Sequence, residues 1–284
     1  MRHATSIRVG PIGFRIGSDF AAPIAALRAL YADYPKSTIA HFSVRLPASA
    51  PWRWLIRPAV AIEGDYMLPD AAPLPLAQGL LAAEMAMNLQ VALGHRRHLL
   101  LHASCVERDG RALLMTGESG SGKSTLAALL GTRGWRFMGD EFVLIAPESG
   151  DAYAFPRAIS LKNQAINVAE RACPTERFGP RLIATPKGDI RHMVPPADAI
   201  ARMDEPARPA LLLFPTFGEQ RDVRPVGAAE AFVRLTQAST NYTALGERGF
   251  RTLTDLVERV PARAIDYPDS DSAIALVETL WRDL

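Results

Sequence analysis

Residues 117–125 have the types and the spacing of a phosphate-binding loop. They read Gly-Glu-Ser-Gly-Ser-Gly-Lys-Ser-Thr and fit the pattern G-x-x-x-x-G-K-[ST]. Glycines let the backbone curl so that successive N–H groups point at anionic phosphates, and a helix N-terminus adds partial positive charge. Lys123 is expected to reach the β- and γ-phosphates, and the Ser124 hydroxyl is expected to ligate Mg²⁺.

The pattern therefore predicts a nucleoside triphosphate site, whereas the plainer interpretation is a Gly/Ser-rich turn that caps a helix. The predicted nucleotide-binding residues are Gly117, Glu118, Ser119, Gly120, Ser121, Gly122, Lys123, Ser124 and Thr125.

Two adjacent carboxylates, Asp140 and Glu141, follow an apolar run seventeen residues after Lys123. Beside a bound triphosphate, one carboxylate can orient the metal while the other accepts the proton of an attacking hydroxyl. A solvated acidic turn is the alternative for this pair. His102 lies twenty-one residues before Lys123, and a lone histidine there is more often a satisfied polar group in a sheet than a catalytic one.

The segments around these residues are those that a phosphate-binding loop needs. Residues 112–115 are apolar and predict a buried strand before the loop, and residues 125–130 predict a helix after it. Residues 99–107 and 111–116 predict a strand pair joined by Asp109-Gly110, a hairpin signal. Residues 135–138 and 142–145 predict strands on either side of the acid pair.

Elsewhere, residues 21–34, 228–237, 248–259 and 270–281 predict helices, and residues 210–214 predict a buried strand. Residues 171–209 show little periodicity and predict a long irregular region. Three prolines in residues 69–75 indicate a linker. We therefore expect an α+β N-terminal domain over residues 1–72 and an α/β catalytic domain over residues 73–284.

Composition narrows the functional classes. The 284 residues are 48% hydrophobic and 22% charged, with a formal net charge of +2, which gives no electrostatic case for a nucleic-acid partner. Two cysteines are too few for a disulfide framework, and no signal peptide opens the chain, so we expect a cytoplasmic protein. The apolar stretch over residues 74–93 is interrupted by polar residues and predicts a buried helix, so no membrane partner is expected.

From His102 to residue 145 the chain resembles the catalytic domain of HPr kinase/phosphorylase. That family has a histidine on the strand before the loop, G-[DE]-S-G-x-G-K-S, a helix ending in R-G-[HW]-R, and an Asp pair. Here the loop is followed by Arg-Gly-Trp-Arg at residues 133–136 and by Asp140-Glu141. More loosely, nearly the whole chain resembles an HPr-kinase-related subfamily.

The resemblance implies an α/β fold: a P-loop kinase domain of the HPr kinase C-terminal type, a mixed sheet flanked by helices, behind a smaller α+β N-terminal domain. It also implies that His102 is the active-site histidine, that Asp140 is the base acting on a substrate serine, and that Ser124 is a Mg²⁺ ligand. Glu141 departs from the second Asp, and the aligned residues 161–167 lack the family's Mg²⁺-ligating Glu. The second metal contact is therefore expected from Asp140, Glu141 or water.

Only four of the 32 Lys and Arg residues are lysines, which draws attention to Lys162 and Lys187. Either could neutralise charge on the transferring phosphoryl group, although a surface role is the alternative for both. Arg191 lies close to Lys187 and is a further candidate for a phosphate or substrate contact.

The sequence thus predicts an ATP- and Mg²⁺-dependent kinase acting on a hydroxyl, most readily a serine of a small protein or peptide. Two alternatives stay open: a kinase for free serine or a sugar, and a nucleotide-binding regulatory protein with negligible turnover. The resembled family forms hexamers, which leaves homo-oligomerisation open here.

Overall fold

The computed structural model describes every residue except 219 and is a mixed α/β structure with several sheets. The chain forms two compact units. The first comprises Met1–His95 and Arg177–Val194, and the second comprises Arg96–Glu176 and Pro195–Leu284. The sequence had suggested ranges of 1–72 and 73–284. The packing differs because the helix after the proline-rich segment packs with the N-terminal elements, and a later hairpin joins the same unit.

The first unit is built on a sheet in the order β1-β2-β3-β5, with bounds His3–Val9, Ile12–Ser18, Phe42–Leu46 and Glu63–Gly64. Ile7 and Val9 alternate with less buried residues in β1, whereas every residue of β2 except Arg15 is buried, as expected for a strand covered on both faces. Helices α1 (Ala21–Leu30) and α2 (Gly79–Gly94) pack on it. The remaining short elements are β4 (Ala59–Val60), β6 (Leu74–Pro75), η1 (Pro51–Trp54), η2 (Leu76–Gln78), β14 (Leu182–Thr185) and β15 (Gly188–Met193).

One helix, spanning Leu76–Gly94, is long and apolar enough by length and composition to cross a membrane. Just over half of its apolar window, 56%, is buried inside the protein. It contacts α1 and β3, which is the packing of a core helix. The predicted buried helix is present, although its α-helical part begins at Gly79, five residues later than expected.

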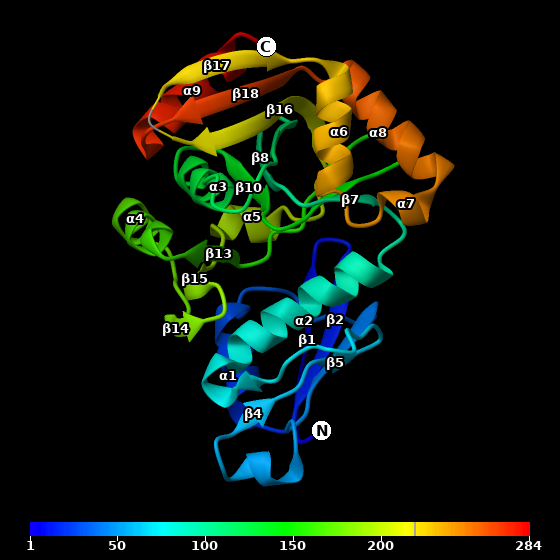
Figure 1. Ribbon diagram of the computed structural model, residues 1–284, viewed down its shortest axis with the longest axis vertical. Helices are drawn as coiled ribbons and strands as arrows, with labels where there is room; N and C mark the ends of the chain where they lie inside the picture. Colours follow the sequence, from blue (N-terminus) through cyan, green and yellow to red (C-terminus); the bar gives the residue numbers. More distant parts are fainter. Residues whose placement is uncertain (219) are drawn as a thin grey trace. The chain divides into compact units, whose positions relative to one another are not determined.

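The second unit is organised around a six-stranded sheet in the order β10-β8-β9-β16-β18-β17 (Figure 1). Their bounds, in that order, are Arg136–Gly139, Ser104–Arg108, Arg111–Met115, Arg208–Phe217, Ala262–Tyr267 and Asp222–Val226. Strands β9, β16 and β18 are parallel, β8 and β17 are antiparallel to their neighbours, and β10 is antiparallel to β8. Strands β9, β10, β16 and β18 therefore all run in one direction.

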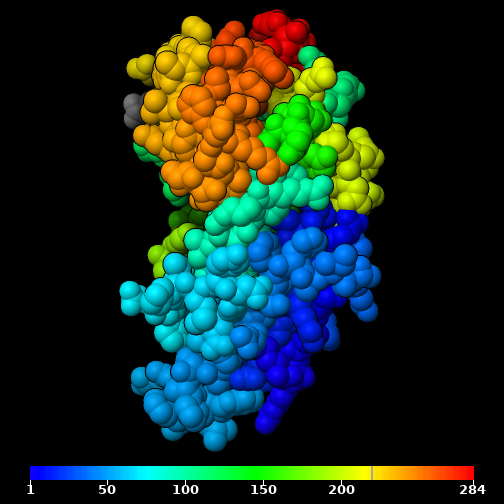
Figure 2. Space-filling model, turned by 90° about the vertical axis from the view of Figure 1, so that its right-hand side faces the viewer, coloured from blue at the N-terminus to red at the C-terminus, as the bar shows by residue number. Residues whose placement is uncertain are grey.

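Helices cover both faces of this sheet. Buried residues of α6 (Ala228–Ala238) and α8 (Glu247–Arg259) share a core with one face, while α3 (Lys123–Gly131) and α9 (Ser270–Arg282) pack against the strands from the other (Figure 1). Much of the surface of this unit in Figure 2 belongs to the orange α7 (Tyr242–Leu245) and α8. The other elements are β7 (Leu99–Leu101), β11 (Val143–Ile145), β12 (Ala152–Tyr153), β13 (Ile159–Lys162), α4 (Gln164–Ala172) and α5 (Ala197–Ala201).

The prediction of an irregular region over residues 171–209 is wrong. This range contains the β14–β15 hairpin and α5, and it begins within α4. The segments are short and interrupted by Pro and Gly, so none of them is long enough to show a period in the sequence. The Asp109-Gly110 turn is confirmed, since both residues adopt positive φ angles of 56° and 75° between β8 and β9.

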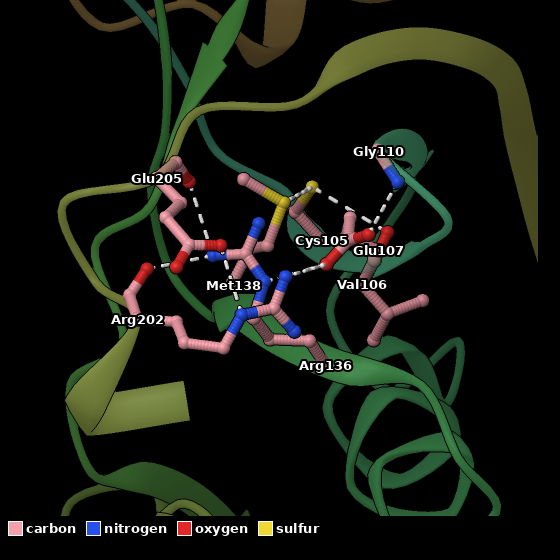
Figure 3. Close-up of polar contacts among 8 residues, drawn as sticks. All are labelled: Cys105, Val106, Glu107, Gly110, Arg136, Met138, Arg202 and Glu205. Carbon is pink, nitrogen blue, oxygen red and sulfur yellow. Dashed lines mark hydrogen bonds and ion pairs between the residues drawn. The ribbon is translucent and has the colours of Figure 1, made fainter. Parts of the chain in front are cut away.

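A buried ion pair joins β8 to β10 (Figure 3). Glu107 accepts from Arg136 Nε at 2.5 Å and from the backbone N–H of Gly110 at 2.6 Å. Arg136 Nη1 also donates to the carbonyl oxygens of Arg202 and Glu205, at 2.8 and 3.0 Å. Both charged side chains are 2% exposed, so this network satisfies charges that burial would otherwise penalise heavily. It fixes the register of the two strands.

Candidate active site

The phosphate-binding loop and the acid pair lie at the same edge of the six-stranded sheet. Strand β9 ends at Met115 immediately before the loop, and β10 ends at Gly139 immediately before Asp140. Because β9 and β10 run in the same direction, their carboxyl ends meet at one edge. The antiparallel β8 begins at that edge, where Ser104 lies opposite Met115. Three segments distant in sequence therefore converge there.

The loop curls as its sequence predicts. Gly120 and Gly122 adopt φ angles of 88° and 85°, a region that glycine enters without strain. Lys123 opens helix α3, and its ammonium group donates to the carbonyl oxygens of Gly117 and Glu118 at 2.8 and 2.7 Å. Burial lowers the pKa of Lys123, against the opposing charges of Asp140 and Glu141.

Tyr267 supports the loop from β18, two strands away from β9. Its hydroxyl donates to the carbonyl oxygen of Ser121 at 2.7 Å, and burial raises its pKa to about 12. A Cβ atom at Gly122 would lie only 2.1 Å from this hydroxyl, so the close approach requires glycine. No sequence motif marks Tyr267, because its position beside the loop follows from the parallel pairing of β18 with β16.

Asp140 is buried directly beside the start of α3. Its Oδ1 atom accepts hydrogen bonds from Ser124 Oγ at 3.0 Å and from Ser104 Oγ at 2.5 Å. Its Oδ2 atom is also buried but has no hydrogen-bond partner among the described residues. Burial, and then the charge of Glu141, raise the pKa of Asp140, while the two serine hydroxyls and His102 oppose the rise.

Glu141 points toward His102 instead. The Oε2 atom of Glu141 lies 3.5 Å from Nε2 of His102, and the histidine side chain is 51% exposed. Burial alone would raise the pKa of Glu141, but His102, Lys162 and Arg157 together lower it to about 2. The two adjacent carboxyls thus have pKa values displaced in opposite directions, which separates their chemical roles.

The residues present fit a magnesium ion. Ser124 supplies the hydroxyl that a phosphate-binding loop uses as a ligand, and it is already hydrogen-bonded to Asp140. The Asp140 carboxylate next to Ser124 offers, through Oδ1, a further oxygen for the ion or for a water bound to it. Among the residues described, no three His, Cys, Asp or Glu side chains form a metal cluster. Mg²⁺ commonly uses one or two protein oxygens together with phosphates and water, and Ser124 and Asp140 carry such oxygens.

Two cations lie close enough to influence the acid pair. Lys162 ends strand β13 and acts on both Lys123 and Glu141. Arg157, which sequence reasoning missed, is 3% exposed and acts on Glu141. A buried arginine beside an acid pair is not marked by any short motif, so its place emerges only from the fold.

Lys187 and Arg191 belong to the first compact unit, whereas the loop belongs to the second. Lys187 is exposed in the turn between β14 and β15. Arg191 Nε donates to the carbonyl oxygen of Gly179 at 2.8 Å, and its guanidinium lies 5.1 Å from the ring centroid of Phe178. The predicted phosphate or substrate contacts of Lys187 and Arg191 stay predictions.

Comparisons with known proteins match parts of the chain. The family model described as SynChlorMet cassette protein ScmC matches residues 79–170, which include the loop, His102 and the acid pair but cover less than half of the chain. No curated protein matches. Among solved structures, the chain is similar to the structure of the Hpr(Ser) kinase/phosphatase from Coxiella burnetii, with 15% identity over 65% of this chain and 94% of that one. The TM-score is 0.30, so this similarity carries no argument, and the case for function depends on the site itself.

Proposed function

We propose that the chain is a P-loop phosphotransferase that transfers the γ-phosphoryl group of Mg·ATP to a hydroxyl group. The acceptor we propose is a serine of a small protein or peptide, in the cytoplasm, and the second unit would be a kinase domain of the HPr kinase C-terminal type. The observation that carries the proposal is the buried Asp140 carboxylate, which is hydrogen-bonded to the loop serine and keeps one oxygen atom without a partner among the described residues.

The reaction would use these residues in the following way. The loop amides and Lys123 would bind the β- and γ-phosphates, and Ser124, hydrogen-bonded to Asp140, would hold Mg²⁺. The metal ion, when bound, neutralises charge on the phosphate oxygens. The acceptor oxygen forms a bond to the γ-phosphorus while the bond to the β–γ bridging oxygen breaks, so ADP leaves.

Asp140 Oδ2 is proposed to take the proton of the acceptor hydroxyl. A raised pKa makes this carboxylate a better base than an ordinary aspartate, which is the direction that general-base catalysis near neutral pH requires. Glu141, with a pKa of about 2, stays ionised and holds His102 beside the reacting groups. Lys162 and Arg157 supply positive charge on the same side.

The test is transfer of label from γ-labelled ATP to serine-containing peptides and proteins, with free serine and sugars as parallel acceptors. We expect Asp140→Asn to abolish transfer while ATP binding, measured separately, is retained. Asp109→Asn, in the exposed turn at the far end of β8, is the matched control and should leave transfer unchanged.

Transfer that survives in Asp140→Asn would remove the proposed base. Tight ATP binding by the unaltered chain without transfer to any acceptor would instead favour a nucleotide-binding regulatory protein. Transfer confined to free serine or a sugar would replace the protein acceptor by a small molecule.

A further inference from the structure

Strand β1 forms one edge of the sheet in the first unit (Figure 1). It is the longer of the two edges, because β5 at the other edge has only two residues. Two of its outward-facing backbone groups are already bonded. The carbonyl oxygen of Ala4 accepts from Arg28 Nη2 at 2.6 Å, and the N–H of Arg8 donates to the carbonyl oxygen of Pro35 at 2.9 Å.

These two bonds show which residues of β1 turn their backbone N–H and C=O groups away from β2. In an antiparallel pair, every second residue turns both backbone groups away from its partner strand. Ala4 and Arg8 are such residues, so Ser6 between them also points its N–H and C=O outward. Among the described residues no partner is present for these two groups of Ser6. A free edge of this kind is a template for pairing with another strand.

A groove of about 880 Å³ follows this edge. It is lined by residues 4–7 of β1, by part of α1 and by residues between 34 and 40. Three cations line it, Arg15, Arg28 and Lys36, and no described lining residue is acidic. All three are exposed, and Arg15 lies opposite Ser6 in the register of β1 and β2. The nearby Asp33 is already paired with Arg177 at 2.7 Å.

We propose that this groove binds an extended, acidic polypeptide segment that adds to the sheet as a strand beside β1. The backbone groups of Ser6 would pair with the segment, and its carboxylates would meet the three cations. Main-chain hydrogen bonds give such strand addition its affinity, and side-chain contacts give it specificity. Charge also decides against a second copy of this chain, since pairing of two β1 edges would bring two sets of like charges together.

This inference does not depend on phosphoryl transfer, because it concerns binding to the first unit alone. Where the kinase proposal holds as well, the segment would belong to the acceptor and lie apart from its phosphorylated serine. Failure of binding would leave the site at Asp140 untouched, and failure of transfer would leave the groove untouched.

The test uses the full chain and fluorescein-labelled peptides of about ten residues, a length that spans a strand of this size, read by fluorescence anisotropy at about 0.15 M salt. An alternating Glu-Val peptide should bind. An alternating Lys-Val peptide should not bind. A Glu-Val peptide methylated at every backbone nitrogen has the same charge but no backbone N–H group, so it should bind at least about tenfold more weakly than Glu-Val.

Two sets of variants locate the binding. Arg15→Glu/Lys36→Glu should weaken binding of the Glu-Val peptide at least about tenfold, because it reverses two of the three cations. Arg45→Glu, on an exposed position of β3 two strands from the edge, is the control and should change affinity less than about twofold. Ser6→Pro removes an N–H that β2 does not use, and it should abolish binding while the chain stays folded by circular dichroism.

Several results would overturn the proposal. These are no binding of Glu-Val, equal binding of the N-methylated Glu-Val peptide, or equal effects of the groove variant and the Arg45→Glu control. A dimer that Ser6→Pro converts to a monomer, seen by light scattering, would assign the edge to a second copy instead.

Discussion

Replacing Gly122 by alanine tests the packing that holds the phosphate-binding loop in shape. The residue combines two constraints, a φ angle of 85° and a Tyr267 hydroxyl 2.1 Å from the position of an added Cβ. A left-handed conformation costs a non-glycine residue about 1–2 kcal/mol, and overpacking costs about 1–3 kcal/mol more. We therefore expect Gly122→Ala to lower the free energy of unfolding by about 2–5 kcal/mol and to weaken ATP binding.

Gly120→Ala separates the two constraints. Gly120 has a φ angle of 88° in the same loop, but no atom lies within 4 Å of an added Cβ. This variant should therefore lose only the conformational term, about 1–2 kcal/mol. The difference between the two alanine variants then measures the contact with the Tyr267 hydroxyl.

Tyr267→Phe completes the cycle. Alone it removes the hydrogen bond to the Ser121 carbonyl and should cost about 0.5–1.5 kcal/mol. Combined with Gly122→Ala it also removes the clashing atom, so the next ring atom lies 3.3 Å from the Cβ position. The double variant should be more stable than the sum of the single losses predicts, by at least about 1 kcal/mol. Urea unfolding with ATP titration by calorimetry measures both effects, and simple additivity would refute the proposed contact.

Three further predictions concern the buried polar groups. Ser104→Ala removes a hydrogen bond that lowers the pKa of Asp140, so the acidic limb of the pH–rate profile should move to higher pH. In steady-state kinetics, the transfer rate at pH 6 should fall at least about threefold relative to the rate at pH 8. Arg136→Met leaves the buried Glu107 without its hydrogen-bonded arginine, with only the partly exposed Arg202 3.5 Å away, and should cost about 3–5 kcal/mol in urea unfolding. Glu107→Gln/Arg136→Met should lose less because no charge remains buried. Burial raises the pKa of Glu107, but its arginine and backbone partners lower that pKa overall. The ion pair should therefore stabilise the fold above pH 4.5, and this stabilisation should be lost as the pH falls through the lowered pKa. Thermal unfolding measured across pH should show the loss in the unaltered chain and not in the double variant.

The parts of the site that the sequence predicted are those encoded locally. The loop needs its glycines, lysine and serine within nine residues, and the strand and helix that flank it were visible from the same stretch. Asp140 was recognisable because it ends an apolar strand at a suitable distance from Lys123. None of these sequence signals requires knowledge of which strands are neighbours in the sheet.

The parts that were missed depend on sheet order. Ser104 reaches Asp140 because β8 lies between β9 and β10, and Tyr267 reaches the loop because β18 lies beside β16. Strands β17 and β18 were not predicted at all, since the short run from Ala262 to Tyr267 does not alternate: its two charged residues, Arg263 and Asp266, are three positions apart. Pairing between strands far apart in sequence is a tertiary property, so no local pattern could have identified these two side chains.

The same argument explains why the acid pair was predicted as a pair but not as two different groups. In the sequence Asp140 and Glu141 are equivalent neighbours, and only their surroundings distinguish them. Asp140 continues the end of β10 into a site closed by two serine hydroxyls, whereas Glu141, with a φ angle of 72°, turns its carboxylate toward a half-exposed histidine and two cations. Burial therefore raises the pKa of Asp140, whereas for Glu141 the histidine and the two cations together outweigh burial and lower the pKa. Because the turn at Glu141 sends adjacent side chains into opposite environments, the separation of the proposed base from an ionised partner follows from one backbone conformation.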